Sequence, residues 1–458
     1  MKKENLKGEI TVFLSLVFVL LLSFIGGMLD SASIQISKNY RRTNMDKAIH
    51  SIFAEYQKNI LEEYNIFTLE GSYETGEYSE EQVLKRLEYY GATANEQEIT
   101  KIQLLTDNHG YAFKEQVVFY MQNKLGIDIM KKALDTTPAW REMEIQGEEF
   151  LETEETTTQE LDLQLEEAGT KLEVENNPLD TISNVKQSNL LQIVMPKSGQ
   201  LSNKSITLES QASQRILKKG KGMVQSSKDA EGELSSLLLG EYLLEHFAQA
   251  NNPNESGALS YELEYLLEGK ASDQQNLEAV VKKILLMRTG PNFLYLQTDA
   301  NKKAEAEALG LALASAAAVP ILAEAVTQAI LAAWAFGESI IDVRSLLNNK
   351  KVPLIKNSES WQLQLTSLLK LGTNEDLEEG EDNESGLTYK EYLRILLFLE
   401  KENSYIMKAL DVIENNMKIG KGLSFFQVDQ CINKIEVAST CNLKRGITYH
   451  FPSYLGYQ

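Results

Sequence analysis

The sequence predicts a mainly α-helical protein with a smaller β part, an α+β fold whose first element is a long N-terminal helix. Three patterns predict this class. A charge-free apolar run fills residues 10–29. Several long stretches carry apolar residues at three- and four-residue spacing, which is typical of helices. Residues 435–457 alternate β-branched and aromatic side chains around a polar turn, which is typical of an antiparallel hairpin.

The apolar run is long enough to span a membrane. Twenty helical residues rising about 1.5 Å each cover about 30 Å, the thickness of the bilayer hydrocarbon core. Lys2, Lys3 and Lys7 precede the run, which favours a cytoplasmic N-terminus. We therefore expect a short cytoplasmic tail (1–9), a transmembrane helix (10–29) and an extracellular C-terminal part of a single-pass cell-membrane protein. Cleavage after the small residues 31–33 is the alternative, although signal peptides have shorter apolar regions of about 7–15 residues.

The next segment, residues 30–70, predicts an amphipathic helical stalk that continues the membrane helix to about Phe67. Its apolar residues recur on one helix face, at Met45, Ile49, Ile52, Phe53, Tyr56, Ile60 and Tyr64. Such a stripe must be covered, either by a globular domain or by a neighbouring subunit.

The rest of the chain divides by composition. Residues 71–141 give a mixed α/β signal, and residues 142–177, rich in Glu and Thr, predict an acidic linker. Residues 178–373 predict a mainly helical domain, with one short buried strand at 190–195 and an Ala-rich core hairpin at 308–323. Residues 374–387 predict an acidic loop. Residues 388–458 predict a helix, opened by a capping box at Thr388 and Glu391, and the C-terminal β-hairpin.

Charge and motifs exclude several function classes. The net charge of −21 over 458 residues argues against nucleic acid as a partner, because binding phosphates needs a basic surface. Nucleotide-binding glycine loops, metalloprotease motifs and nucleophile elbows are absent from the sequence, and the four histidines lie far apart. We expect no enzyme activity, no cofactor and no metal site.

One polar pattern inside an apolar helix needs an interpretation. Glu338 and Asp342 lie one helical turn apart, and Trp334 occupies the preceding turn. Paired carboxylates can act as acid and base or bind a metal. We instead interpret these three residues as a structural polar seam that meets Arg344 or Lys350.

The two cysteines, Cys431 and Cys441, are candidates for a disulfide in an exported protein. They lie ten residues apart, so they can meet only if the chain turns between them. A bonded pair and two free thiols both stay open.

Three small residues of the apolar run form a candidate association face. Ser23, Gly27 and Ser31 are spaced four residues apart and therefore stack on one side of the helix. Small residues let helix backbones approach closely in lipid, which favours association. The plainer interpretation is that Gly and Ser are simply common in membrane helices.

Several blocks resemble an uncharacterised family of Gram-positive bacterial membrane proteins. They are Tyr261-Glu-Leu-Glu-Tyr-Leu-Leu-Glu-Gly-Lys270, Ala333-Trp-Ala-Phe-Gly-Glu-Ser-Ile-Ile-Asp342, Lys351-Val-Pro-Leu-Ile-Lys356 and Thr388-Tyr-Lys-Glu-Tyr-Leu393. The N-terminal blocks Gly8-Glu-Ile-Thr-Val-Phe-Leu14, Phe53-Ala-Glu-Tyr56 and Tyr64-Asn-Ile-Phe67 resemble TadE/TadG-like proteins of tight-adherence pilus systems.

The resemblance implies a pseudopilin-like structural component of a pilus-like or secretion apparatus, anchored in the membrane and facing outward. Its expected partners are the lipid bilayer and pilin-like or secretion-system proteins, a second copy of the chain among them. The alternative is a cell-surface enzyme or a cell-wall-binding protein whose site is assembled from residues distant in sequence.

Overall fold

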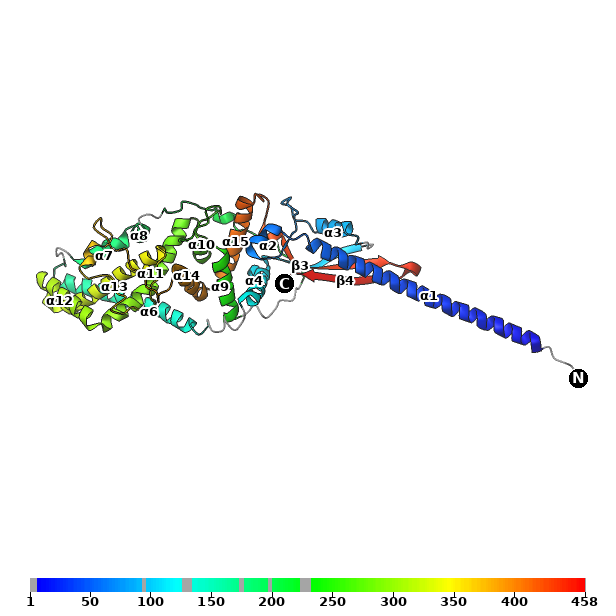
Figure 1. Cartoon of the computed structure of the whole chain (residues 1–458), viewed down its shortest axis with the longest axis horizontal. Coiled ribbons are helices and arrows are strands. Elements are labelled where there is room, and N and C mark those ends of the chain that lie inside the picture. Colours follow the sequence, from blue (N-terminus) through cyan, green and yellow to red (C-terminus); the bar gives the residue numbers. More distant parts are fainter. Residues whose placement is uncertain are drawn as a thin grey trace. The chain divides into compact units, whose positions relative to one another are not determined.

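The computed structural model describes residues 6–92, 96–125, 134–172, 177–196, 200–222 and 232–457. The chain forms two compact units. The first contains Met1–Gln116, Leu217–Ser227 and Phe425–Gln458, and the second contains Val117–Ile216 and Lys228–Ser424. Helices dominate, and the named strands belong to the first unit (Figure 1). The predicted class, a mainly α protein with a long N-terminal helix and a C-terminal hairpin, is confirmed.

The first unit combines one long helix with an antiparallel sheet. Its elements are α1 (Leu6–Phe53), α2 (Lys58–Tyr64), β1 (Leu69–Glu70), α3 (Glu80–Tyr89), β2 (Glu96–Leu104), the start of α4 (Asp107–Leu125), η5 (Val428–Gln430), β3 (Cys431–Asn442), η6 (Lys444–Gly446) and β4 (Thr448–Gly456). Strand β3 is central, pairing with β2 along one edge and with β1 and β4 along the other. The core lies where Ile49 and Ile52 of α1 and Leu87 of α3 join Ile435 and Val437 of β3.

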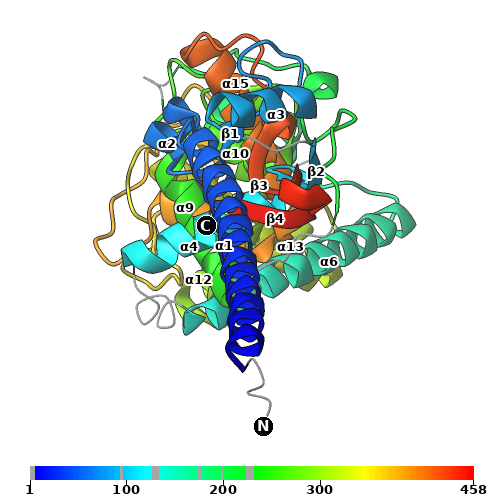
Figure 2. The ribbon, with the colours of Figure 1, turned by 90° about the vertical axis from the view of Figure 1, so that its right-hand side faces the viewer.

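The β3–β4 hairpin runs beside the second half of α1, and four contacts fix its position. They are the ion pair of Arg445 with Asp30, Lys38 Nζ at 5.1 Å from the Tyr449 ring centre, Ser453 Oγ to Asp46 Oδ1 at 2.8 Å, and Tyr457 Oη to the Phe53 carbonyl at 2.6 Å. Each step covers seven or eight helical residues and four strand residues. The helical residues of one step cover about 12 Å and the strand residues about 13 Å, so successive contacts lie at the same height along the helix and the strand. The hairpin turn therefore lies level with Asp30. Figure 2 shows β4 beside α1, as Figure 1 does.

The expected continuous rod to Phe67 is wrong, because α1 ends at Phe53. The chain bends there, and Gln57 starts α2 by accepting a hydrogen bond from the Asn59 amide. The Gln57 amide also donates to the Thr68 carbonyl at 2.8 Å, which holds the bend closed. The bend buries Ile60 within the first unit instead of leaving it on an extended rod. The first unit thus covers the apolar stripe itself, apart from Tyr56, which is exposed.

The second unit is helical. Its elements are α6 (Thr137–Glu167), α7 (Pro178–Gln187), α8 (Leu190–Val194), η1 (Leu208–Ser210), α9 (Glu233–His246), α10 (Glu262–Glu268), α11 (Asp273–Thr298), α12 (Ala300–Ala316), η3 (Pro320–Leu322), α13 (Ala323–Leu347), η4 (Ser367–Lys370), α14 (Tyr389–Leu399) and α15 (Glu402–Gly420). Helices α11 and α13 pack on each other, with α12 against α13 and α6 against both. The Ala-rich segment 308–323 forms the second half of α12 and the turn to α13. The expectation that it is a core hairpin is wrong, because Leu311 and Ile321 are 54% and 90% exposed. The predicted capping box at Thr388 and Glu391 is confirmed.

The predicted acidic linker at 142–177 is wrong over most of its length, because α6 extends to Glu167. An apolar stripe recurs along it at helical spacing and is buried: Trp140, Met143, Gly147, Phe150, Leu161 and Leu165. The acidic and hydroxyl side chains occupy the exposed face, where Thr153 and Thr156 donate to carbonyls four residues earlier. Residues 173–176 of the expected linker lie outside the described residues.

Two further boundaries differ from the expectation. The expected strand at 190–195 is the short helix α8, which Asn189 caps by accepting from the Leu191 amide. The expected unit 388–458 divides, because α14 and α15 belong to the second unit while the hairpin belongs to the first. The division arises because β3 pairs with strands formed more than 300 residues earlier in the chain.

Candidate functional site

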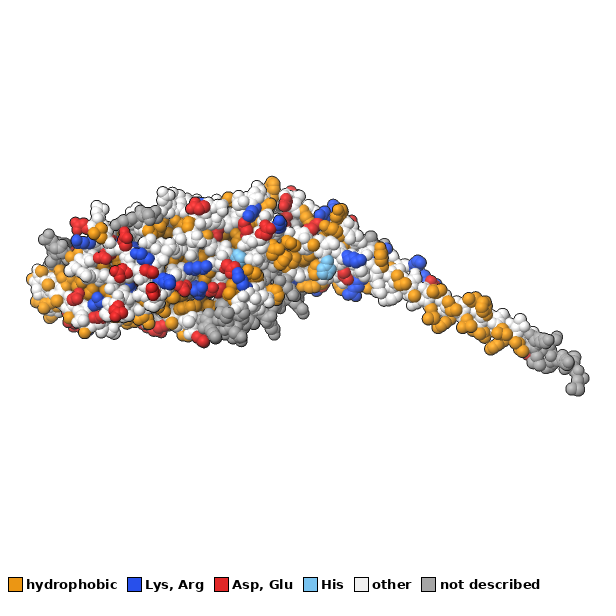
Figure 3. All heavy atoms as spheres, in the orientation of Figure 1, with side chains coloured by type: hydrophobic (Ala, Val, Ile, Leu, Met, Phe, Trp, Pro, Cys, Tyr) orange, Lys and Arg blue, Asp and Glu red, His pale blue; other side chains and the backbone are white. Residues whose placement is uncertain are grey.

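The N-terminal half of α1 exposes an apolar surface. The large apolar side chains of residues 10–29, Val17 apart, are 51–69% exposed. The most apolar part of this helix has a mean hydropathy of 2.7 and is not buried at all by the rest of the chain. Figure 3 shows hydrophobic side chains spread along this part of the helix, with polar groups and backbone between them. It is long and apolar enough to cross a membrane. Helix α13 also meets that test of length and composition, but it is mostly buried in the second unit.

The candidate association face lies on this exposed half. Ser23, Gly27 and Ser31 are all exposed. A Cβ atom added at Gly27 would meet no atom within 4 Å. The three residues are therefore available to a neighbouring helix, and their role in association stays a prediction.

The second sequence-predicted group lies in the core of the second unit. Lys356 Nζ lies 2.5 Å from Glu338 Oε1 and 2.7 Å from Asp342 Oδ1. Arg288 Nη2 approaches Asp342 Oδ2 to 2.9 Å, and all four side chains are fully buried. Trp334, one turn away, donates from Nε1 to the Leu363 carbonyl at 2.8 Å. We refer to Arg288, Glu338, Asp342 and Lys356 as the buried charge cluster.

The partners expected for this seam were wrong. Arg344 instead pairs with Asp376, and Lys350 donates to the Gly380 carbonyl. The Arg344 side chain leaves α13 on the side away from Asp342, because two-residue spacing turns a helix by more than half a turn. Lys350 lies beyond the end of α13 at Leu347.

The electrostatics of the buried charge cluster indicate a structural role. Two cations face two anions, so the cluster is close to neutral overall. Burial alone would raise the pKa of Asp342, but Lys356 and Arg288 outweigh it and hold this pKa below its usual value. Burial raises the pKa of Glu338, and Lys356 offsets this only in part. Glu338 also accepts from the Leu363 amide at 2.6 Å, so the cluster fastens the loop after α13 to that helix.

Two other buried carboxyl groups were missed by the sequence reasoning. Glu264 accepts from the Ala250 amide and the Tyr389 hydroxyl, and burial raises its pKa to about 7. Asp411 accepts from Ser213 and Tyr265, and burial raises its pKa to about 6. Their partners come from distant elements, so no local pattern distinguishes these carboxyl groups from exposed ones.

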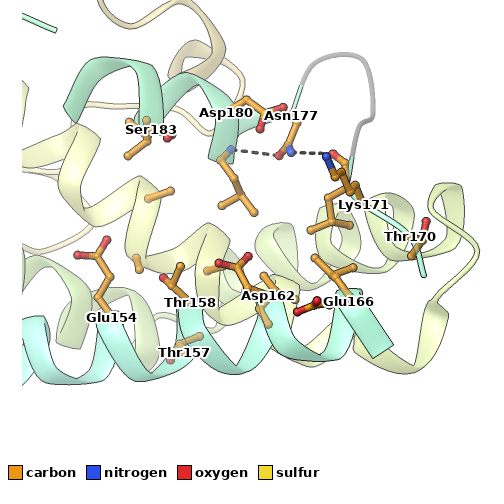
Figure 4. Close-up of a pocket in the computed structure, with 18 of the residues that line it drawn as sticks. Glu154, Thr157, Thr158, Asp162, Glu166, Thr170, Lys171, Asn177, Asp180 and Ser183 are labelled. Atoms are coloured by element: carbon orange, nitrogen blue, oxygen red, sulfur yellow. Dashed lines mark hydrogen bonds between the residues drawn. The ribbon is translucent and has the colours of Figure 1, made fainter. Parts of the chain in front are cut away.

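The second unit also contains a cleft of about 1350 Å³ between α6 and α7 (Figure 4). The side chains on the α6 wall include Asp162 and Glu166, and Asp180 stands opposite on α7. The floor includes Ala332 and Ala333 of α13, which leave room because their side chains are small. The sequence reasoning missed this cleft because it treated one wall as a linker.

The two cysteines are not joined by a disulfide, so of the two alternatives left open the reduced thiols hold. Cys431 and Cys441 begin and nearly end the same strand, β3. Ten residues of extended chain cover about 33 Å, whereas disulfide-bonded residues have Cα atoms within about 7 Å. Both thiols are fully buried.

Taken together, the chain is a mainly helical protein with an exposed apolar N-terminal helix that packs its second half on an antiparallel sheet. A family model described as "Family of unknown function (DUF5702)" matches residues 168–443, more than half of the chain. The chain belongs to this family. The internal sequence blocks that resemble an uncharacterised family all lie within the matched residues. No curated protein and no solved structure matches the chain.

Proposed function

We propose that the protein is a membrane-anchored, extracytoplasmic structural component of a pilus-like or secretion apparatus, of the TadE/TadG-like, pseudopilin-like kind, in a Gram-positive bacterium. The exposed apolar half of α1 is the observation that carries this proposal. Burying apolar surface contributes about 25 cal/mol per Å². A whole apolar helix in water is therefore costly, and a bilayer removes that cost.

The arrangement of the first unit supports a pilin-like role. Half of α1 extends from the unit, and the other half packs on the antiparallel sheet. This is the arrangement that the resemblance to pilus components implies, and the likeness is one of architecture. In such an assembly the projecting helices are the surfaces that associate, with copies of the chain or with pilin-like partners.

Crosslinking in membranes tests the association. Replacing Ser23 and Gly27 with leucine should lower the yield of crosslinked oligomers several-fold, because bulky side chains keep the helix backbones apart. Insertion should be unchanged, since leucine is favourable in the bilayer. The matched control changes Thr11 and Ile25 to leucine, two exposed residues on the opposite side of the same helix. Equal yields from the wild-type chain and both variants would show that this face contacts only lipid.

The cleft favours a second candidate function, the binding of a cell-wall ligand. Its walls offer hydroxyls, four carboxylates and two lysines, Lys171 and Lys186. The excess of carboxylates over lysines suits a polar ligand carrying an amine. This function is compatible with anchoring, because the cleft lies wholly within the second unit.

A further inference from the structure

The turn of the β3–β4 hairpin carries two adjacent basic residues, Lys444 and Arg445, both exposed. The neighbouring segments 30–45 and 437–453 contain five basic residues and a single acidic one, Asp30, in a chain whose net charge is −21. These two segments are therefore more basic than the chain as a whole.

The ion pair between Arg445 and Asp30 fixes the height of the turn along α1. Asp30 directly follows the last residue of the apolar run, Leu29. If residues 10–29 fill the hydrocarbon core, Asp30 lies at its edge. The headgroup layer adds about 5–8 Å on each side of that core. Lys444 and Arg445 consequently lie at the level of the lipid headgroups.

Asp30 pairs with Arg445, whereas the other charges of α1 and β2 near the hairpin lie farther away. Lys38 lies eight residues beyond Asp30, which is about 12 Å along the helix. Arg41 and Arg42 lie eleven and twelve residues beyond Asp30 on the same helix, which is about 17 Å. Glu96 of β2 is paired with Thr440, five residues before Arg445, which is about 16 Å along the strand. Charges are screened beyond about 10 Å at 0.1 M salt. Of these charges, the turn residues are therefore the ones that act on headgroup phosphates.

The backbone of the turn supports a role for the Arg445 charge. Arg445 has φ = +61°, a left-handed conformation that costs a residue with a side chain about 1–2 kcal/mol relative to glycine. The Arg445 side chain points to Asp30 at the edge of the apolar run. In this ion pair the side chain of Arg445 remains 68% exposed and that of Asp30 44% exposed.

We propose that the β3–β4 turn is a contact site for anionic lipid headgroups, with Lys444 and Arg445 binding the phosphate groups. The inference rests on the proposed anchoring of α1 and goes beyond it, because it names a second, charge-dependent contact of the first unit with the membrane. The contact holds the first unit against the membrane surface, whereas α1 alone would leave it free to tilt.

A fluorescence experiment on the full chain tests this site. Thr448→Cys places an exposed thiol beside the turn, and the native cysteines are buried, so a fluorophore labels the new position. The labelled protein is reconstituted into vesicles of phosphatidylcholine, with or without phosphatidylglycerol, containing headgroup spin-labelled lipid. We expect stronger quenching with phosphatidylglycerol. We also expect this excess to fade between 0.1 M and 1 M salt, as the screening length falls from about 10 Å to about 3 Å.

Lys444→Gln is the decisive variant, because it keeps the Arg445–Asp30 pair. One basic residue near an anionic surface contributes about 1 kcal/mol, so the equilibrium constant of the contact should fall about fivefold. Lys58→Gln removes an exposed charge on α2 and should leave the quenching unchanged. The headgroup site would be overturned if the protein floats with the vesicles but is quenched equally in both lipids. It would also be overturned if Lys444→Gln and Lys58→Gln have the same effect. Either result leaves the anchor intact. Failure to float with either vesicle would overturn the anchor, and the headgroup site with it.

Discussion

Replacing Lys356 with methionine should lower the free energy of unfolding by about 3–5 kcal/mol, because it leaves two carboxylates buried without their shared cation. Lys356 bridges Glu338 and Asp342, and all three side chains are fully buried. Arg288 contacts Asp342 but not Glu338. Denaturant unfolding of the full chain in detergent, followed by the circular dichroism of the helices, measures the change.

Two companion variants make this result specific to the buried charge cluster. Lys282→Met removes a cation from α11 whose ion pair with Glu278 is largely exposed, and it should cost less than 1 kcal/mol. Adding Glu338→Gln to Lys356→Met should restore part of the lost stability, because one uncompensated charge disappears. Equal effects of the Lys356 and Lys282 variants would contradict the structural role assigned to the cluster.

Stability should also fall as the pH rises from about 4.5 to about 7, through the titration of Glu264. Burial raises the pKa of Glu264 from 4.5 to about 7 in the folded chain. The folded state therefore holds this proton where the unfolded state has lost it, so the group's contribution is full below pH 4.5 and is lost as the pH passes 7. At 1.36 kcal/mol per pKa unit, the loss is about 3 kcal/mol. Asp411, with a pKa raised to about 6, acts in the same direction.

The Glu264→Gln variant isolates this contribution. Glutamine resembles the protonated acid and does not titrate, so the variant should gain about 3 kcal/mol relative to the wild-type chain between pH 4.5 and pH 8. Glu307→Gln, on the exposed face of α12, is the matched control. Unfolding curves of the three chains across this pH range give the comparison. A constant difference between the Glu264 variant and the wild-type chain would show that this carboxyl is ionised throughout.

Local signals predicted part of the fold well. The apolar run, the capping box at Thr388 and the turn around 442–446 depend on residues close in sequence, so one sequence suffices to find them. Helix α6 was missed although its buried stripe from Trp140 to Leu165 is also local. Its many Glu and Thr residues dominated the composition and obscured the spacing of the few apolar ones.

Long-range pairing could not be predicted in the same way. Glu338 and Asp342 were singled out by spacing, but their partners Lys356 and Arg288 reach them through the packing of a loop and of α11. Strand β3 pairs with β2 across more than 300 residues, so the sequence order concealed the first unit. The cleft and the basic turn likewise depend on elements that only folding brings together.

Protease digestion of intact protoplasts tests the central claim, that α1 spans the membrane and holds both units outside. Added protease should degrade the chain beyond Asp30. A short N-terminal fragment, recognised by a tag before Met1, should stay in the membrane pellet after alkaline washing. A detergent-lysed sample is the control for protease access. Full protection of the chain in intact protoplasts, with digestion only after lysis, would contradict the outward orientation. Release of the intact chain by the alkaline wash would contradict the anchor itself.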